Sequence, residues 1–179
     1  EKPQDLSNNL AVVGCYYFEH SEALLEAIEE QIERDVSLKG EYYLADALNI
    51  MLERGLRMRT EQVQVWLDAG TPEALLDTNR YLLEHGRDNS ERYAGLEDTI
   101  ILPPVNIHPE ALVNRSVLGP NLSLGEGAVV EDSIISDSII GPGTRITTSR
   151  LKTSLIGHDV TVTGQSGQLN LGDDSRAIQ

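Results

Sequence analysis

VNIHPEALVNRSVLGPNLSLGEGAVVEDSIISDSIIGPGTRITTSRLKTSLIGHDVTVT, residues 105–163, is the stretch that decides the fold of this 179-residue chain. Single aliphatic residues recur in it at intervals of five or six residues, over a span of more than fifty. They are Ile107, Val113, Leu118, Leu124, Val130, Ile135, Ile140, Ile146, Leu151, Ile156 and Val162. This spacing is neither the period of a helix nor strict strand alternation. A short fixed period that persists over many repeats predicts a solenoid.

We expect each repeat to be a short parallel strand that points its aliphatic side chain into a triangular core. The glycine, asparagine and aspartate residues between them suit the corners, where a positive φ is often required. The eleven aliphatic positions predict between three and four coils of a left-handed parallel β-helix of hexapeptide-like repeats. An ordinary β-sandwich is the alternative. Residues 164–179, which include LNLGDDS, are expected to form a final strand or a cap.

The first half of the chain has the pattern of an α/β domain. LAVVGCYYF, residues 10–18, is an apolar run of strand length, and residues 62–67 alternate as a second strand would. A helix capped by Ser21 should follow the first strand, and another should end at Gly55. Residues 87–98 are polar and predict a linker or a short irregular crossing. We therefore predict two domains, one over 1–98 and the β-helix over 99–179.

Residues 68–73, DAGTPE, join the second expected strand to a third helix. Thr71 is a good N-cap and Pro72 suits the first helical position, and the helix is expected to reach Gly86. Asp68 would then lie at the carboxyl end of a strand, the edge at which open α/β sheets bind ligands. Asp68 is therefore a candidate site residue. The plain alternative is that its charge stabilises the helix N-terminus.

Composition narrows the classes of function. The formal net charge is −15 and no basic cluster is present, so the chain is not expected to bind nucleic acid. The sequence contains no apolar run near the length of a membrane span and no signal peptide. A cytoplasmic protein without membrane contact is the expectation.

Several segments, in this order, resemble the sugar-1-phosphate nucleotidyltransferase family. They are Glu1-Lys2-Pro3, AVVGCYYF over residues 11–18, YLADAL over 43–48 and WLDAGT over 66–71. The following solenoid, with LNLGDDS near its end, resembles the long-form glucose-1-phosphate thymidylyltransferases. The resemblance implies the C-terminal, sugar-binding half of a Rossmann-like α/β nucleotidyltransferase domain, followed by a left-handed β-helix. This sequence departs from the family's pattern at Ala45, where threonine is usual, and Ala69 is a further mild departure.

The resemblance also implies roles for four residues. Glu1 would accept hydrogen bonds from sugar hydroxyls, and Lys2 would contact the sugar 1-phosphate and serve catalysis. The backbone of Val12 would line the sugar site, and Asp68 would be one of two carboxylates that hold a catalytic Mg²⁺. The implied substrates are a sugar 1-phosphate, with glucose favoured, and a nucleoside triphosphate, with dTTP favoured. The family's glycine-rich nucleotide loop, GGxGTRL, is absent from these residues, so the chain alone is expected to be inactive.

Two other functions stay open at this point. Many left-handed β-helix proteins are acyltransferases that use a histidine between neighbouring coils, and His108 and His158 occupy expected corners. A non-catalytic regulatory or assembly module of the same transferase family is the other alternative. In each case the faces and the open end of the solenoid need covering, which predicts a homo-oligomer.

Overall fold

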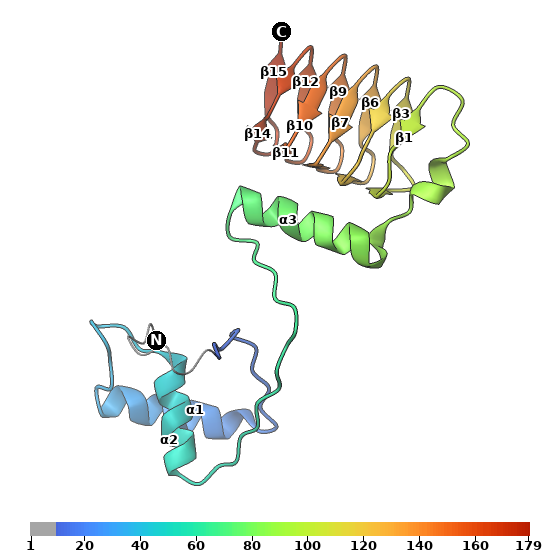
Figure 1. Cartoon of the computed structure of the whole chain (residues 1–179). Helices are drawn as coiled ribbons and strands as arrows, with labels where there is room; N and C mark the ends of the chain where they lie inside the picture. The colour runs from blue at the N-terminus through green and yellow to red at the C-terminus, as the bar shows by residue number, and fades with distance from the viewer. Residues whose placement is uncertain (1–9) are drawn as a thin grey trace. The chain divides into compact units, whose positions relative to one another are not determined.

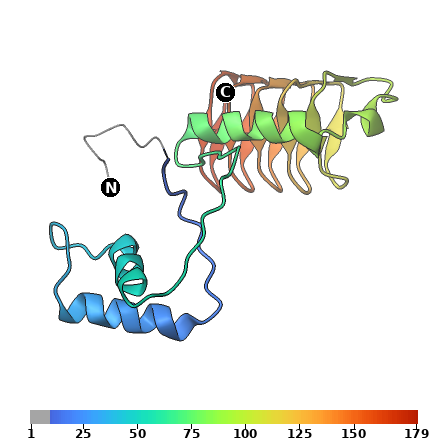
Figure 2. The ribbon, with the colours of Figure 1, turned by 60° about the horizontal axis from the view of Figure 1, so that its bottom comes forward.

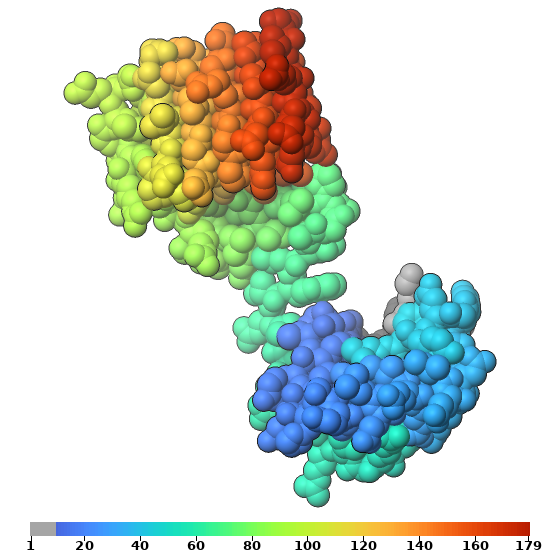
Figure 3. Space-filling model, turned by 180° about the vertical axis from the view of Figure 1, so that it is seen from behind, coloured from blue at the N-terminus to red at the C-terminus, as the bar shows by residue number. Residues whose placement is uncertain are grey.

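The computed structural model describes residues 10–179. Residue contacts divide the chain into two compact units, Glu1–Trp66 and Leu67–Gln179. Figure 1 shows a helical first unit and a second unit made mainly of stacked coils, and the colours of successive coils follow one another across the surface of the second unit in Figure 3. The division after Trp66 separates two groups of residues that contact each other more than they contact the rest of the chain. The boundary that we predict at 98/99 separates sequence modules and stays a prediction.

Two helices form the core of the first unit. They are α1 (Ser21–Glu33) and α2 (Leu44–Glu53), which pack against each other around Ala27, Ala47, Ile50 and Met51. Both predicted helices are thus confirmed, and Gly55 follows α2 with a φ of +85°, as a left-handed C-terminal cap requires. The predicted capping role of Ser21 is wrong. Ser21 is the first helical residue, and the N-cap residue His20 makes no side-chain cap hydrogen bond.

Polar side chains hold the connection between these helices. Gln31 is buried in α1, and its amide donates hydrogen bonds to the carbonyls of Val36, at 3.2 Å, and Tyr43, at 3.1 Å. These bonds satisfy the buried amide and fix both ends of the loop between the helices. On the acidic outer face, Arg34 pairs with Glu30 and Glu53, and Arg54 pairs with Glu26 and Glu30.

The two strands predicted at 10–18 and 62–67 are not present. In the described residues from 10 to 98, the only β-pairing is an isolated bridge between Leu38 and Glu41. Apolar side chains of both segments are exposed, with Tyr17 at 90% and Trp66 at 67% of full exposure. A strand is stable only when a neighbouring strand takes up its N–H and C=O groups. No such neighbouring strand lies among the described residues of this unit, so these two segments form no strand there.

The second unit contains a parallel β-helix, which confirms the central prediction. Among residues 10–179, fifteen strands form three five-stranded parallel sheets. The β1 sheet comprises β1 (Ile100–Ile101), β4 (Val117–Leu118), β7 (Ile134–Ser136), β10 (Arg150–Lys152) and β13 (Ser166–Gly167). The β2 sheet comprises β2 (Val105–Ile107), β5 (Leu122–Leu124), β8 (Ser138–Ile140), β11 (Leu155–Ile156) and β14 (Asn170–Leu171). The β3 sheet comprises β3 (Leu112–Asn114), β6 (Val129–Glu131), β9 (Arg145–Thr147), β12 (Thr161–Thr163) and β15 (Arg176–Ile178).

Each coil contributes one strand to each sheet, so the described β-helix has five coils rather than the predicted three to four. The extra strands lie at both ends. β1 precedes the periodic stretch, and β13 to β15 follow it within the predicted final segment. Of the eleven aliphatic positions of the sequence pattern, all are buried except Val113, which packs against the core while partly exposed.

The corners use both positive φ angles and buried hydroxyls. Asp132, Asp137 and Asp159 have left-handed backbones, as predicted for aspartate, but so do Arg115 and Thr148. A ladder of buried serines runs along the corner between the β3 and β1 sheets. The Oγ of Ser116 accepts a hydrogen bond from the backbone N–H of Ser133 at 3.1 Å. In the next coil, the Oγ of Ser133 accepts one from the backbone N–H of Ser149 at 3.0 Å. These hydroxyls take up backbone groups that the turns would otherwise leave unpaired.

Helix α3 (Pro72–Leu82) lies along the outer face of the β2 sheet, across β5 and β8 (Figure 2). Leu76 is buried on this side of the helix. The Nδ2 of Asn79 donates to the carbonyl of Asn121 at 3.2 Å, and its Oδ1 accepts from the Ser123 hydroxyl at 2.6 Å. A π-helical turn, η1 (Leu83–Arg87), ends the helix, and Gly86 there has a φ of +105°.

The predicted N-cap of this helix is confirmed, because the Thr71 hydroxyl accepts a hydrogen bond from the N–H of Ala74 at 3.2 Å. Thr71→Ala should therefore lower the free energy of unfolding of the second unit by about 1 kcal/mol. Thr71→Ser keeps the hydroxyl and should lose much less. Urea denaturation followed by far-UV circular dichroism measures both variants. If Thr71→Ala and Thr71→Ser lost the same free energy of unfolding, the N-cap hydrogen bond would contribute nothing to stability.

Of the two alternatives for residues 87–98, the short irregular crossing is confirmed and the free linker is not. These residues include η2 (Ser90–Tyr93) and pair with the first edge of the β2 sheet. The N–H of Asn89 donates to Val105, and its side chain both donates to the Ile107 carbonyl and accepts from the Ile107 N–H, at 2.8 and 2.9 Å. Asp88 accepts from the N–H of Val105 at 3.0 Å. This cap covers the backbone edge at which the β-helix begins, a position prone to uncontrolled strand pairing.

The cap should be sensitive to acid. Burial raises the pKa of Asp88, but hydrogen bonds from the N–H groups of Ser90 and Val105 and from the Ser90 hydroxyl outweigh it, and the net pKa is lowered. A carboxyl whose folded-state pKa lies below its unfolded value of about 4 stabilises the fold above that value. That contribution is lost as the pH falls through the folded-state pKa. The melting temperature of Asp88→Asn should thus fall below that of the parent at pH 7, and the gap should close in acid. Exposed Glu84→Gln is the control, and a gap independent of pH would contradict the prediction.

Candidate functional site

The best-defined candidate site residue is Asp68, in the turn before α3. One of its carboxylate oxygens accepts a hydrogen bond from the N–H of Gly70 at 3.0 Å, which closes an Asx turn. The Asp68 carbonyl accepts from the Thr78 hydroxyl at 2.8 Å, so the turn is tied to the second turn of the helix. Asp68 does not follow a strand, contrary to the prediction, since residues 62–67 are irregular.

This turn presents a carboxylate to solvent in a fixed position. Its second oxygen has no hydrogen bond to any described residue, and the side chain is exposed. Magnesium takes one or two protein carboxylates and completes its shell with phosphate oxygens and water, so such an oxygen suits it. The helix N-terminus is capped by Thr71 rather than by Asp68, which leaves the carboxylate free for another role.

Asp68 is not part of a ready-made metal centre in the described region. No group of three or more histidine, cysteine, aspartate or glutamate side chains that could hold a metal ion occurs in residues 10–179. Val12, which belongs to the first unit, is irregular and 77% exposed. Glu1 and Lys2 lie outside the described residues. The substrate roles of Glu1, Lys2 and Val12 stay predictions.

The two histidines considered for acyl transfer are far apart. Both lie at the corner between the β2 and β3 sheets, His108 in the first coil and His158 in the fourth. Three coil steps separate them, about 14 Å at the usual strand spacing. The Nδ1 of His108 accepts from the N–H of Glu110 at 3.3 Å, and the backbone N–H of His158 donates to Asp173 at 2.8 Å. The two histidines therefore cannot act together in one site on one chain.

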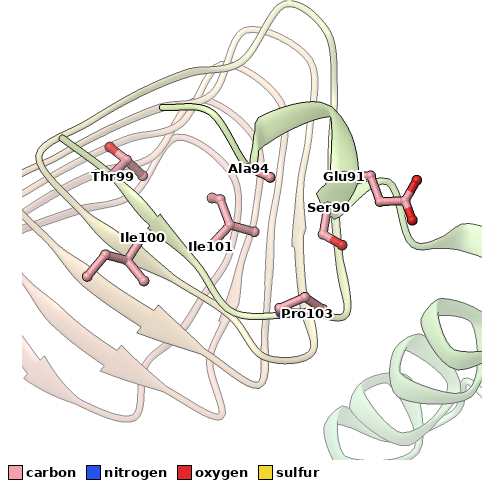
Figure 4. A pocket seen from close by; sticks show the side chains of 7 residues that line it. All are labelled: Ser90, Glu91, Ala94, Thr99, Ile100, Ile101 and Pro103. Carbon is pink, nitrogen blue, oxygen red and sulfur yellow. The ribbon is translucent and has the colours of Figure 1, made fainter. Parts of the chain in front are cut away.

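A pocket lies at the end where the β-helix begins, between β1 and η2 (Figure 4). Its volume is about 380 Å³. Its lining residues are Ser90, Glu91, Ala94, Thr99, Ile100, Ile101 and Pro103. None of the predicted site residues is among them, and the Glu91 carboxylate points away from β1. The pocket is thus an apolar hollow beside the cap and shows no arrangement of catalytic groups.

The chain matches known proteins along its whole length. Residues 1–85 match the family model described as Nucleotidyl transferase. A glucose-1-phosphate thymidylyltransferase of Streptomyces griseus is 32% identical over 99% of this chain and 55% of its own length. The similarity therefore spans both the α/β segments and the β-helix. The chain belongs to the sugar-1-phosphate nucleotidyltransferase family.

Other members of the family extend this picture. A glucose-1-phosphate thymidylyltransferase of Streptomyces antibioticus is 29% identical over 92% of this chain and 45% of its own length. A glucose-1-phosphate adenylyltransferase of Desulforamulus reducens is 28% identical over 78% of this chain and 39% of its own length. The chain spans about half the length of the curated relatives it matches. Among the described residues, no helix is long and apolar enough to cross a membrane.

Structural residues, rather than catalytic ones, were missed by the sequence patterns. Gln31 lies on the apolar face of α1, and a polar residue at such a position could have been recognised as a buried hydrogen-bonding group. Asp88 and Asn89 precede a short helical turn, which is a common position for side chains that bond the backbone. No local pattern indicates that their partners lie on β2.

Proposed function

We propose that this chain is the C-terminal part of an enzyme that joins glucose 1-phosphate to dTTP and gives dTDP-glucose and pyrophosphate. The observation that carries the proposal is the similarity to the Streptomyces griseus protein of that name over 99% of this chain. Nucleoside triphosphates are cytoplasmic metabolites, which suits a cytoplasmic enzyme.

The chemistry assigns a task to each candidate residue. In the reaction, a phosphate oxygen of the sugar 1-phosphate attacks the α-phosphorus of the triphosphate, and pyrophosphate leaves. Both reactants are anions, so the rate depends on positioning and on neutralising their charge. Lys2 would contact the 1-phosphate, while Glu1 and the Val12 backbone would hold the sugar. Asp68 would hold Mg²⁺ through its open oxygen, and the ion when bound supplies charge neutralisation at the phosphates.

The exposed apolar segments of the first unit support the view that the active enzyme contains more polypeptide. Residues 10–18 and 62–67 have strand composition but no strand partner among the described residues, and Tyr17 and Trp66 are largely exposed. Large apolar side chains that are exposed in segments of strand composition suit an interaction site. We propose that strands of the remaining nucleotidyltransferase domain pair with these two segments and complete the sheet. The homo-oligomer expected from the solenoid belongs to the same proposal.

The test is an assay of dTTP-dependent pyrophosphate release with glucose 1-phosphate. The chain alone should show none, since it lacks the glycine-rich nucleotide loop. A fusion of the N-terminal half of the Streptomyces griseus relative to this chain should be active, and UTP and ATP in place of dTTP test the choice of base. Activity of the chain alone would refute the proposed dependence on further polypeptide. A folded but inactive fusion would favour the alternative, a non-catalytic assembly module.

A further inference from the structure

Directional hydrogen bonds attach helix α3 to the β-helix. Within α3, all of which lies in the described residues, only Leu76 is buried. The side chain of Asn79 donates to the carbonyl of Asn121 at 3.2 Å and accepts from the hydroxyl of Ser123, on β5, at 2.6 Å. Apolar contact has no preferred direction, whereas hydrogen bonds weaken steeply when they are misaligned. The amide of Asn79 therefore fixes the place and the rotation of α3 on the β2 sheet (Figure 2).

Thr78, the residue before Asn79, connects the same helix to the turn that carries Asp68. A threonine in a helix commonly donates its hydroxyl to a carbonyl three or four residues earlier. The Thr78 hydroxyl instead donates to the carbonyl of Asp68, ten residues earlier, at 2.8 Å. The Asp68 carboxylate is held separately, by the N–H of Gly70 at 3.0 Å. The backbone and the carboxylate of Asp68 are thus both fixed relative to α3.

These two adjacent residues form one path from the β-helix to the Asp68 carboxylate. Asn79 fixes α3 on the β2 sheet and Thr78 fixes Asp68 on α3, and all three residues belong to the second unit. Thr78 and Asn79 are half-buried, whereas Asp68 is exposed. The exposed Arg80 also approaches the β-helix, 3.7 Å from Asp137, but an exposed ion pair of this kind contributes little. The two hydrogen-bonded side chains therefore carry the connection.

We propose that Thr78 and Asn79 are positioning residues for nucleotidyl transfer, which hold the Asp68 carboxylate at a fixed place on the β-helix. The inference rests on the proposed function, in which Asp68 holds Mg²⁺. Transfer between two anions depends on accurate positioning, and a misplacement of about 1 Å can cost on the order of 100-fold in rate. Loss of either residue lets the turn or the helix shift and leaves the charge of Asp68 in place. The β-helix is thereby a rigid platform for the reaction.

Kinetics of the active fusion test this role. Thr78→Val and Asn79→Ala should each lower kcat about tenfold and raise the Mg²⁺ concentration that gives half the maximal rate about fivefold. The KM for glucose 1-phosphate should change less than about twofold, because other residues hold the sugar. Thr78→Ser keeps the hydroxyl and should restore the parent values. Since the two residues act in series, the double variant should lose about as much as each single variant, and losses that multiply would overturn the single path.

A second measurement on the full chain needs neither metal nor substrate. Hydrogen exchange followed by NMR reports on the amides of Gly70, bonded to the Asp68 carboxylate, and Ala74, bonded to the N-cap hydroxyl. Thr78→Val should speed exchange at Gly70 at least about threefold and leave Ala74 unchanged, because only the turn loses its anchor. Asn79→Ala should leave both amides at the parent rates, since Thr78 still holds the turn to the helix. Parent exchange at Gly70 in Thr78→Val would overturn the proposal.

A control variant separates positioning from a general loss of stability. Ile146→Val shortens a fully buried side chain on β9, outside the sheet on which α3 lies, and lowers the melting temperature. It should keep the parent kcat and the parent dependence on Mg²⁺. An inactive parent fusion would refute the proposed function and this inference with it. An active parent fusion whose Thr78→Val and Asn79→Ala variants keep the parent kcat would refute this inference alone.

Discussion

Asp68→Asn should lower dTTP-dependent pyrophosphate release about 100- to 1,000-fold in the active fusion, while the melting temperature stays that of the parent. The amide oxygen of asparagine can accept the hydrogen bond from Gly70 as the carboxylate does, so the Asx turn persists. What the substitution removes is the negative charge that would hold Mg²⁺. The Mg²⁺ concentration that gives half the maximal rate should therefore rise, in addition to the loss in rate.

Two further variants separate a metal role from a structural one. Asp68→Ala removes both the charge and the turn, so it should lose as much activity as asparagine and also lower the melting temperature. Asp77→Asn, on the exposed side of α3, removes an equal charge from the same helix and should leave activity unchanged. If Asp68→Asn keeps the activity of the parent and only Asp68→Ala lowers it, Asp68 acts by holding the turn. The metal role assigned to it is then wrong.

The β-helix could be predicted from the sequence because its signal is local and repeated. Each inward residue, such as Ile135 or Ile146, is fixed by its place in a short repeat, and neighbouring coils have the same pattern. The number of coils was underestimated because the five- to six-residue pattern does not extend to the first strand, β1, or through the last coil. In the last coil, Gly167 takes the position that Leu151 holds in the coil before it.

The first unit could be predicted only in its helices. The spacing of apolar residues on α1 and α2 is a property of each segment alone, whereas a strand depends on a partner distant in the sequence. The run at 10–18 therefore predicts the ability to pair, and whether pairing occurs is decided by polypeptide outside the segment. The same dependence explains why the cap was missed. Asn89 is polar and looks like a loop residue, but its partners are backbone groups of Ile107.

In the candidate site, too, the local features could be predicted from the sequence and the tertiary arrangement could not. Thr71 and Pro72 fix the turn before α3 through local chemistry, and the sequence predicted this correctly. The Asx turn of Asp68 is equally local. What Asp68 faces is a matter of tertiary arrangement, and neither periodicity nor composition carries that information. The roles of Glu1 and Lys2 rest on the family resemblance and lie outside the described residues.

Ile135→Ala should produce the largest loss of stability among the predictions made for the second unit, about 2–5 kcal/mol in the free energy of unfolding. Ile135 is fully buried on β7, in register with Leu118 on β4 and Leu151 on β10. Truncation removes apolar contacts with both neighbouring coils and leaves a cavity that stacked, hydrogen-bonded strands cannot close. Because each coil is stabilised only by its neighbours, the loss should spread to the whole stack.

Ile134→Ala is the matched control, since it is the adjacent residue of the same strand but points outward and is 42% exposed. It should cost less than about 1 kcal/mol. The only tryptophan, Trp66, lies in the first unit, so its fluorescence does not report on the β-helix. Urea unfolding should instead be followed by hydrogen exchange of the amides of β4, β7 and β10. Faster exchange in all three strands for Ile135→Ala, and in none for Ile134→Ala, is the expected result. Similar losses for the two variants would contradict the assignment of Ile135 to the core, because a residue and its neighbour on a strand cannot both point inward.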